Sequence, residues 1–202
     1  MTREIDKPWR PLSVERVAAL FEDASFPWWI AGGLAIDLAV GASTRAHADT
    51  DVLILRVDQR VLRTQLEPWE FWAADPPGTL RRWLADDTLA PGVHDVWCRA
   101  SATDDWRLQI MLDESTQGRW VSRRDERVSL PLDSITRVTD AGISYLAPHV
   151  QLYYKAKNVR QKDQLDFDAL LQRRAEVDWE WLGWAIATTY GAGHRWRRSL
   201  PR

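Results

Sequence analysis

Hydrophobic side chains near the N-terminus switch between helical and strand spacing. Between residues 12 and 23 they recur every three or four positions, after Ser13, a residue type that commonly caps helices. Residues 27–31 are aromatic or apolar and end at Gly32 and Gly33, as in a buried strand closed by a tight turn. The pattern predicts a helix at 12–23, a strand at 27–31, and a short helix at 34–40 that ends at Gly41.

A continuous apolar run at residues 50–56 predicts the centre of a sheet. The sequence TDVLILR is apolar on both faces after its aspartate, as expected for a strand covered on both sides. Two further strands are expected at 93–100 and 106–113, joined by the turn-rich sequence ATDD. In the second of these, alternation puts Leu108, Ile110 and Leu112 on one face and Arg107, Gln109, Met111 and Asp113 on the other. The remaining expectations are a helix at 58–66, a strand at 69–73 and a helix at 79–84.

The pattern changes after about Ser115. Residues 116–147 are rich in loop formers, with short strand candidates around Val128 and Val138. Pro148 fits the first turn of a helix, and helices are expected at 149–157, 162–174 and 178–190. The chain therefore reads as an α/β (α+β) domain over 1–115, followed by a loop-rich connection and a helical region over 116–202.

Composition and charge narrow the possible functions. The formal net charge of -2 over 202 residues does not favour a nucleic acid as the main partner. No stretch is apolar and long enough to span a membrane, and MTREIDKPWR lacks the apolar stretch of a secretory signal, so a cytoplasmic location is expected. Cys98 is the only cysteine, which excludes an internal disulfide and a thiolate metal cluster.

Asp49 and Asp51 are the first candidates for chemistry. Alternate residues of a strand point the same way, so both carboxylates are expected to converge at the start of the central strand. Two like charges so placed are costly unless a cation neutralises them, and oxygen ligands favour a hard ion such as Mg²⁺. An isolated DxD sequence, however, is more often a solvated strand entry or a helix cap.

Neighbouring residues strengthen the case for a phosphate and metal site. Gly32 and Gly33 lie between a strand and a helix, where backbone N–H groups can hold phosphate oxygens, although a lone GG is usually a plain turn. Arg45 and His47 add positive charge and donors between that turn and the aspartates. Asp113 offers a third carboxylate on a neighbouring strand, and three acids around metal ions suit in-line phosphoryl chemistry.

The segment WWIAGGLAIDLAVGASTRAHADTDVLILR resembles the nucleotidyltransferase motif of the polymerase-beta-like superfamily. The likeness is to the branch that contains the bacterial aminoglycoside and lincosamide nucleotidyltransferases. In that branch a GG turn, a helix with an acid, an RxH segment and a DxD pair follow one another in this order. Here they are Gly32 and Gly33, then Asp37, then Arg45 and His47, and finally Asp49 and Asp51. The likeness extends through LQIMLDE at 108–114 and YLAPHVQLYYKAKNVRQKDQLDF at 145–167.

This resemblance implies a minimal nucleotidyltransferase fold, a mixed sheet with flanking helices, and a role for each motif residue. Asp49 and Asp51 would bind Mg²⁺, with two ions expected, and Asp113 would be the third acid and the base. Asp95 and Asp105, on or near the same strand pair, are the alternatives to Asp113. Lys155 and Lys157 would face the nucleotide phosphates. The alternative is that the basic stretch forms a solvated face whose charges pair with Asp163 and Asp166.

The leading hypothesis is a Mg²⁺-dependent enzyme that transfers a nucleoside monophosphate from an NTP, with ATP favoured, to a hydroxyl of a small molecule, releasing pyrophosphate. An aminoglycoside or lincosamide acceptor is implied by the resemblance alone. Two alternatives stay open: a non-catalytic nucleotide-binding or toxin–antitoxin protein with this fold, and an enzyme that nucleotidylates a protein or tRNA. The net charge argues against the tRNA version.

Overall fold

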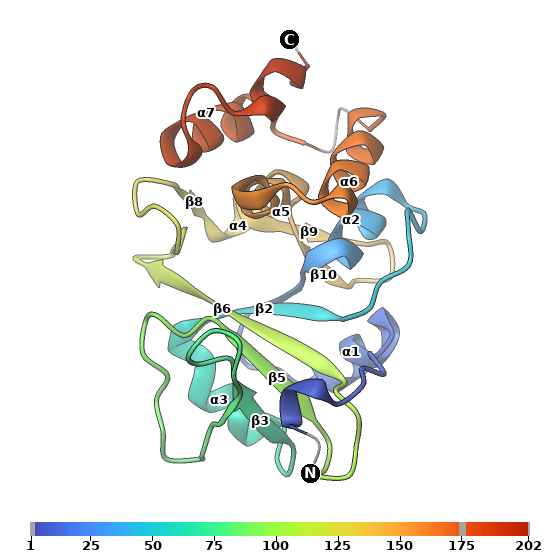
Figure 1. Ribbon diagram of the computed structural model, residues 1–202, viewed down its shortest axis with the longest axis vertical. Coiled ribbons are helices and arrows are strands. Elements are labelled where there is room, and N and C mark those ends of the chain that lie inside the picture. Colours follow the sequence, from blue (N-terminus) through green and yellow to red (C-terminus); the bar gives the residue numbers. More distant parts are fainter. Residues whose placement is uncertain (1–2, 174–176, 202) are drawn as a thin grey trace. The chain divides into compact units, whose positions relative to one another are not determined.

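The computed structural model describes residues 3–173 and 177–201, and the chain forms two compact units. The first comprises Met1–Ile30 and His47–Ser115, and the second comprises Ala31–Ala46 and Thr116–Arg202. Figure 1 shows the elements of both in sequence colours. No helix in the described residues is long and apolar enough to cross a membrane.

The first unit is built on a mixed sheet. Its strands follow the order β4-β3-β5-β6-β2-β1, in which β2 and β6 are parallel and the other neighbours are antiparallel. Their bounds are Trp28–Ile30 (β1), Asp51–Leu55 (β2), Glu70–Ala73 (β3), Arg81–Arg82 (β4), Asp95–Arg99 (β5) and Leu108–Thr116 (β6). The helices of this unit are η1 (Glu4–Asp6), α1 (Val14–Leu20), η2 (Arg56–Asp58) and α3 (Gln59–Gln65). The predicted α/β class with a central strand at 50–56 is confirmed.

Helices α1 and α3 cover one face of this sheet. Phe21, at the end of α1, packs against Trp28 of β1, and Arg63 of α3 lies over the ring of Phe71 in β3. Trp28 pairs with Ile54, so by alternation these contacts are on the face that also carries Leu108, Ile110 and Leu112, which are fully buried. The opposite face carries Asp51, together with Leu53, Leu55 and Met111, which are buried.

Part of that opposite face is closed by a buried arginine. Arg99 of β5 donates to Glu70 at 2.7 and 2.9 Å and to Glu4 of η1 at 2.7 Å, and its guanidinium lies 4.8 Å from the ring centre of Trp106. Trp9 packs edge-on against Trp97 beside it. These contacts fix the N-terminal segment to the sheet, so most of the tryptophans here are structural.

The second unit is mainly helical. Helix α2 packs against α5 and α6, and every residue of α5 is buried. Its helices are α2 (Gly32–Val40), α4 (Leu132–Ile135), α5 (Pro148–Lys155), η3 (Ala156–Asn158), α6 (Gln161–Leu171), α7 (Trp179–Tyr190) and η5 (Arg195–Ser199). Two antiparallel strand pairs accompany them: β7 (Arg119–Val121) with β8 (Ser129–Pro131), and β9 (Thr136–Val138) with β10 (Ser144–Leu146).

Two local predictions need correction. Residues 79–84 do not form a helix; Arg81 and Arg82 form the short edge strand β4. An extended backbone there lets Trp83 reach the core, where it is 1% exposed and packs edge-on against Phe71. Helix α2 also begins at Gly32, two residues earlier than predicted, and Gly32 itself has a φ of +66°. The predicted C-terminal residue of the helix at 162–174 lies outside the described residues.

Candidate active site

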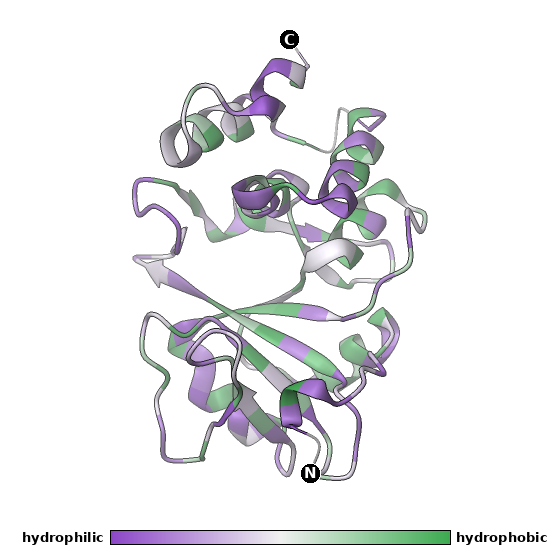
Figure 2. Cartoon of the chain, in the orientation of Figure 1, coloured by the Kyte–Doolittle hydropathy of each residue, from purple (hydrophilic) through white to green (hydrophobic). Residues whose placement is uncertain are grey.

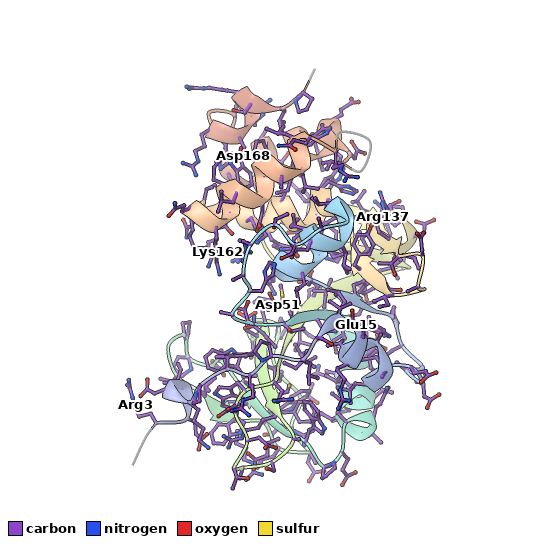
Figure 3. The ribbon with its side chains drawn as sticks, turned by 90° about the vertical axis from the view of Figure 1, so that its right-hand side faces the viewer. Arg3, Glu15, Asp51, Arg137, Lys162 and Asp168 are labelled. Carbon is purple, nitrogen blue, oxygen red and sulfur yellow. The ribbon has the colours of Figure 1, made fainter. Side chains whose placement is uncertain are left out.

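The aspartate pair lies at the start of β2, directed away from α1. Between the two, buried Thr50 donates its hydroxyl to the carbonyl of Leu12 at 2.7 Å, and its own carbonyl accepts from Gln109 N–H at 2.9 Å. Because side chains alternate along an extended segment, Asp49 and Asp51 project to the face opposite Thr50. Both are half-buried, and β2 is hydrophobic except at the end that carries Asp51 (Figures 2 and 3).

The hydroxyl of Thr50 therefore helps to orient the pair. We expect Thr50→Val to lower the free energy of unfolding by about 1–2 kcal/mol, because it removes one hydrogen bond and leaves the Leu12 carbonyl without it. Urea unfolding of the variant measures this change. The control is Thr103→Val in an exposed loop, and an equal loss in both variants would contradict the orienting role.

Gln109, not Asp113, stands opposite Asp51. The parallel register pairs Asp51 with Gln109 and Leu55 with Asp113. Asp113 is on the same face of β6 but four residues further along, which corresponds to about 13 Å at roughly 3.3 Å per residue. Two carboxylate oxygens that share one Mg²⁺ lie within about 4 Å of each other, given bond lengths of about 2.1 Å. The structure thus separates Asp113, which is fully buried, from the pair.

Among the described residues, no group of three or more His, Cys, Asp or Glu side chains is arranged to hold a metal ion. Mg²⁺ in nucleotide sites commonly uses one or two carboxylates together with substrate phosphates and water. The donor set of Asp49 and Asp51 fits that arrangement. It does not fit an all-protein metal cage.

The predicted glycine turn is the N-terminus of α2, in the second unit. Gly32 has a φ of +66°, which a residue with a β-carbon rarely adopts, and its N–H donates to the Gln151 side chain at 2.8 Å. Asp37, one turn later, accepts from the N–H and hydroxyl of Thr44 at 3.0 and 2.6 Å. Asp37 therefore fixes the loop before Arg45 through Thr44.

Arg45 and Lys155 both bind Asp166. Arg45 makes a bidentate pair with Asp166 at 2.9 and 3.0 Å, and the Lys155 ammonium lies 2.8 Å from the same carboxylate. Lys155 also reaches Asp163 at 3.4 Å, and Arg160 pairs with Asp163 at 2.7 Å. The two aspartate side chains are at most 1% exposed. Lys155 and Arg160 thus pair with Asp163 and Asp166, as the alternative to phosphate binding predicts.

The charges in this cluster keep its carboxylates ionised. Burial raises the pKa of Asp166, but the Arg45 hydrogen bonds and the Lys155 charge outweigh it and hold the pKa below its usual value. The pKa of Asp163 is also lowered, because its hydrogen bonds with Arg160 outweigh the effect of burial. Burial lowers the pKa of Arg45, yet Asp166 more than compensates and the net direction is upward.

Lys157 differs from Lys155 in being exposed on η3. His47 is the residue at which the chain re-enters the first unit, and its side chain is half-buried. Two residues near the motif were missed from the sequence: Gln109, whose polar side chain interrupts an apolar strand, and Gln151, which lies 119 positions from its partner Gly32 and leaves no local signal.

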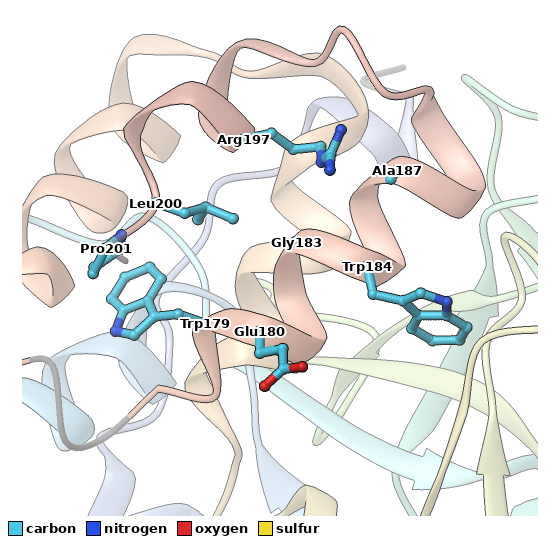
Figure 4. A pocket seen from close by; sticks show the side chains of 8 residues that line it. All are labelled: Trp179, Glu180, Gly183, Trp184, Ala187, Arg197, Leu200 and Pro201. Carbon is cyan, nitrogen blue, oxygen red and sulfur yellow. The ribbon is translucent and has the colours of Figure 1, made fainter.

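A pocket of about 760 Å³ in the second unit lies apart from these residues (Figure 4). It is lined by Trp179, Glu180, Gly183, Trp184, Ala187, Arg197, Leu200 and Pro201. None of the predicted site residues lines it.

Comparison with known families decides the classification. Residues 13–170 match the model of the family described as aminoglycoside-2''-adenylyltransferase. The chain belongs to this family. It is accordingly a nucleotidyltransferase. A search of curated proteins gives no significant match.

Solved structures share the fold of this aminoglycoside-2''-adenylyltransferase family member. Lincomycin-bound LnuA, a lincosamide antibiotic adenylyltransferase, is 14% identical with a TM-score of 0.56, covering 80% of this chain and 98% of LnuA. ANT(2")-Ia with adenylyl-2"-tobramycin is 15% identical with a TM-score of 0.53, covering 88% of this chain and 94% of that one. A solution structure of ANT(2'')-Ia is 16% identical, has a TM-score of 0.52, and covers 92% and 95%. At these identities the likeness establishes the fold.

Proposed function

We propose that the chain transfers AMP from ATP to a hydroxyl group of an aminoglycoside or lincosamide antibiotic and releases pyrophosphate. The observation that carries this proposal is the family match, which spans the aspartate pair. The solved relatives with bound lincomycin or adenylyl-tobramycin support the acceptor class. Asp49 and Asp51, on the face of the sheet opposite α1 and α3, supply the acidic groups that such chemistry requires.

Asp49 and Asp51 are the residues we assign to Mg²⁺. An ion held there would neutralise charge on the triphosphate and favour in-line displacement at the α-phosphate. The hydrogen bond from Thr50 to the Leu12 carbonyl anchors the residue between the two carboxylates. The two aspartates thus suit an ion that arrives with the nucleotide.

We assign the phosphate contacts to Gly33, at the start of α2, and to Lys157. The first turn of a helix presents N–H groups and a positive dipole end to an anion. Gly32 already donates to Gln151, and Arg45 and Lys155 are bound to Asp166, so we propose that these three position the loop and helices.

Lys157 provides a test of the assignment of phosphate contacts. We expect Lys157→Ala to weaken Mg·ATP binding by roughly tenfold, because one charge-assisted hydrogen bond is worth about 1.5 kcal/mol. Isothermal titration calorimetry measures the Kd. Lys162→Ala, on the neighbouring helix α6 (Figure 3), is the control and should leave the Kd unchanged. Equal Kd values for wild type and Lys157→Ala would remove this residue from the nucleotide site.

The test of the function is direct. The protein is incubated with Mg²⁺ and each NTP in turn, together with kanamycin, tobramycin or lincomycin. Mass spectrometry is expected to show an acceptor heavier by one nucleoside monophosphate, and a coupled assay to show one pyrophosphate per product. Binding of Mg·ATP without product from any acceptor would favour a non-catalytic nucleotide-binding protein instead.

A further inference from the structure

The position opposite Asp51 is held by a side chain that cannot act as a base. Gln109 is a carboxamide, which offers a donor and an acceptor but takes no proton near neutral pH. A hydroxyl acceptor must lose its proton as it attacks phosphorus, and a positioned base commonly contributes about 10²–10⁴-fold to such a step. A base for this reaction must therefore come from another residue.

Asp95 is connected to Gln109 directly. Gln109 Nε2 donates to Asp95 Oδ1 at 3.4 Å. The antiparallel register of β5 and β6 pairs Asp95 with Met111 and Trp97 with Gln109, so all four side chains share one face of the sheet. The parallel register adds Asp51 to that face. Asp51, Gln109 and Asp95 thus form a row across three neighbouring strands, β2, β6 and β5.

The spacing of this row suits a base rather than a further metal ligand. Two strand spacings separate Asp95 from Asp51, about 10 Å across the sheet at roughly 4.8 Å each. A general base must reach the acceptor hydroxyl as it approaches the α-phosphate. It does not need to lie close enough to Asp49 and Asp51 to share a metal ion with them. Asp95 is half-buried, so its carboxylate is accessible while its orientation is restrained by Gln109.

Two other acids of the first unit, Glu70 and Glu114, are held by arginines. Glu70 accepts from Arg99 and Arg82, and Glu114 accepts from Arg56 at 2.6 Å. Within the described residues Asp95 has no salt bridge, and its side-chain contact is the amide of Gln109. An arginine-bound carboxylate is a weaker proton acceptor than one bound by a neutral amide.

We propose that Asp95 is the general base of nucleotidyl transfer in this chain and that Gln109 positions it. This proposal rests on the proposed function. The acceptor O–H bond breaks and its proton passes to the Asp95 carboxylate, while the acceptor oxygen forms a bond to the α-phosphorus. The bond from the α-phosphorus to the bridging oxygen breaks, and pyrophosphate leaves with that electron pair.

The test compares wild type with Asp95→Asn, Asp113→Asn, Asp23→Asn and the double variant Asp95→Asn/Gln109→Glu. Each is assayed with Mg·ATP and the acceptor that wild type modifies, over pH 5 to 9, and the Kd for Mg·ATP is measured separately. Asp23 is exposed in the first unit and serves as the matched control. We expect Asp95→Asn to lower kcat at least a hundredfold, with the Kd for Mg·ATP within threefold of wild type.

Glutamate at position 109 restores a carboxylate to the row, so the double variant is expected to recover at least tenfold in kcat. Near-wild-type kcat in Asp95→Asn, or a hundredfold loss confined to Asp113→Asn, would overturn the assignment and leave the proposed function intact. A wild-type protein that adenylylates no acceptor would instead refute the function, and the assignment with it. Circular dichroism of each variant shows whether any loss reflects unfolding.

Discussion

Asp51→Asn is expected to lower the rate of adenylyl transfer by about a thousandfold while the fold is retained. The substitution removes a metal-binding charge with little change in volume, and a loss of roughly 4 kcal/mol in transition-state stabilisation corresponds to about a thousandfold in rate. Asp51 begins β2 and is half-buried, so the strand and its register should tolerate the amide. The rate is measured at saturating Mg·ATP and acceptor.

The same variant should need more Mg²⁺ for half-maximal rate, and this distinguishes a metal ligand from a residue that only shapes the strand. Asp23→Asn removes an exposed carboxylate of the same unit and should change neither the rate nor the Mg²⁺ requirement. Undiminished activity in Asp51→Asn would exclude the aspartate pair as the metal site.

Asp166→Asn should have the largest effect on stability, a loss of about 3–5 kcal/mol in the free energy of unfolding. The side chain is fully buried and binds both Arg45 and Lys155, so the substitution leaves Arg45 with a neutral partner and Lys155 with the longer 3.4 Å pair to Asp163. Asp168→Asn, exposed on the same helix (Figure 3), should change stability by no more than about 0.5 kcal/mol. Chemical denaturation at pH 7 compares the two.

The pH dependence provides an independent check on Asp166. Its pKa is lowered in the folded protein, so its contribution is complete above the unfolded value of about 3.9 and is lost as the pH falls through the folded value. The stability difference between wild type and Asp166→Asn should therefore shrink on acidification below about pH 4. A difference that stays constant down to pH 2 would contradict the ionised cluster.

Periodicity and local signals predicted most elements of this fold. Alternation in LQIMLDE correctly placed Leu108, Ile110 and Leu112 on one face, where all three are buried, and Ser13 caps α1 by accepting from Arg16 N–H. The helix predicted at 79–84 failed because burial of Trp83 outweighs a weak local preference. The backbone conformation there depends on the contact between Trp83 and Phe71, which are distant enough in sequence that local patterns do not reveal it.

The site could be predicted only as far as spacing along the chain determines geometry. Asp49 and Asp51 are neighbours in sequence, and alternation alone brings them to one face. The distance from Asp51 to Asp113 depends on the register of β2 against β6, which the sequence does not specify when both strands are mostly apolar. The same register places Gln109 opposite Asp51, and the register of β5 against β6 brings Gln109 into contact with Asp95.

The division of the chain also affects how the protein can be dissected or recombined. The segment Ala31–Ala46 lies in sequence between the two parts of the first unit but packs within the second, where α2 relies on Gln151 and Asp166 supports Arg45. A fragment that ends at Ser115 would retain all the aspartates of the motif yet expose the apolar side of α2 to water. Gene fusions, domain exchanges and split-protein designs in this family should therefore keep Ala31–Ala46 together with Thr116–Arg202, and should not cut the sequence at a single point.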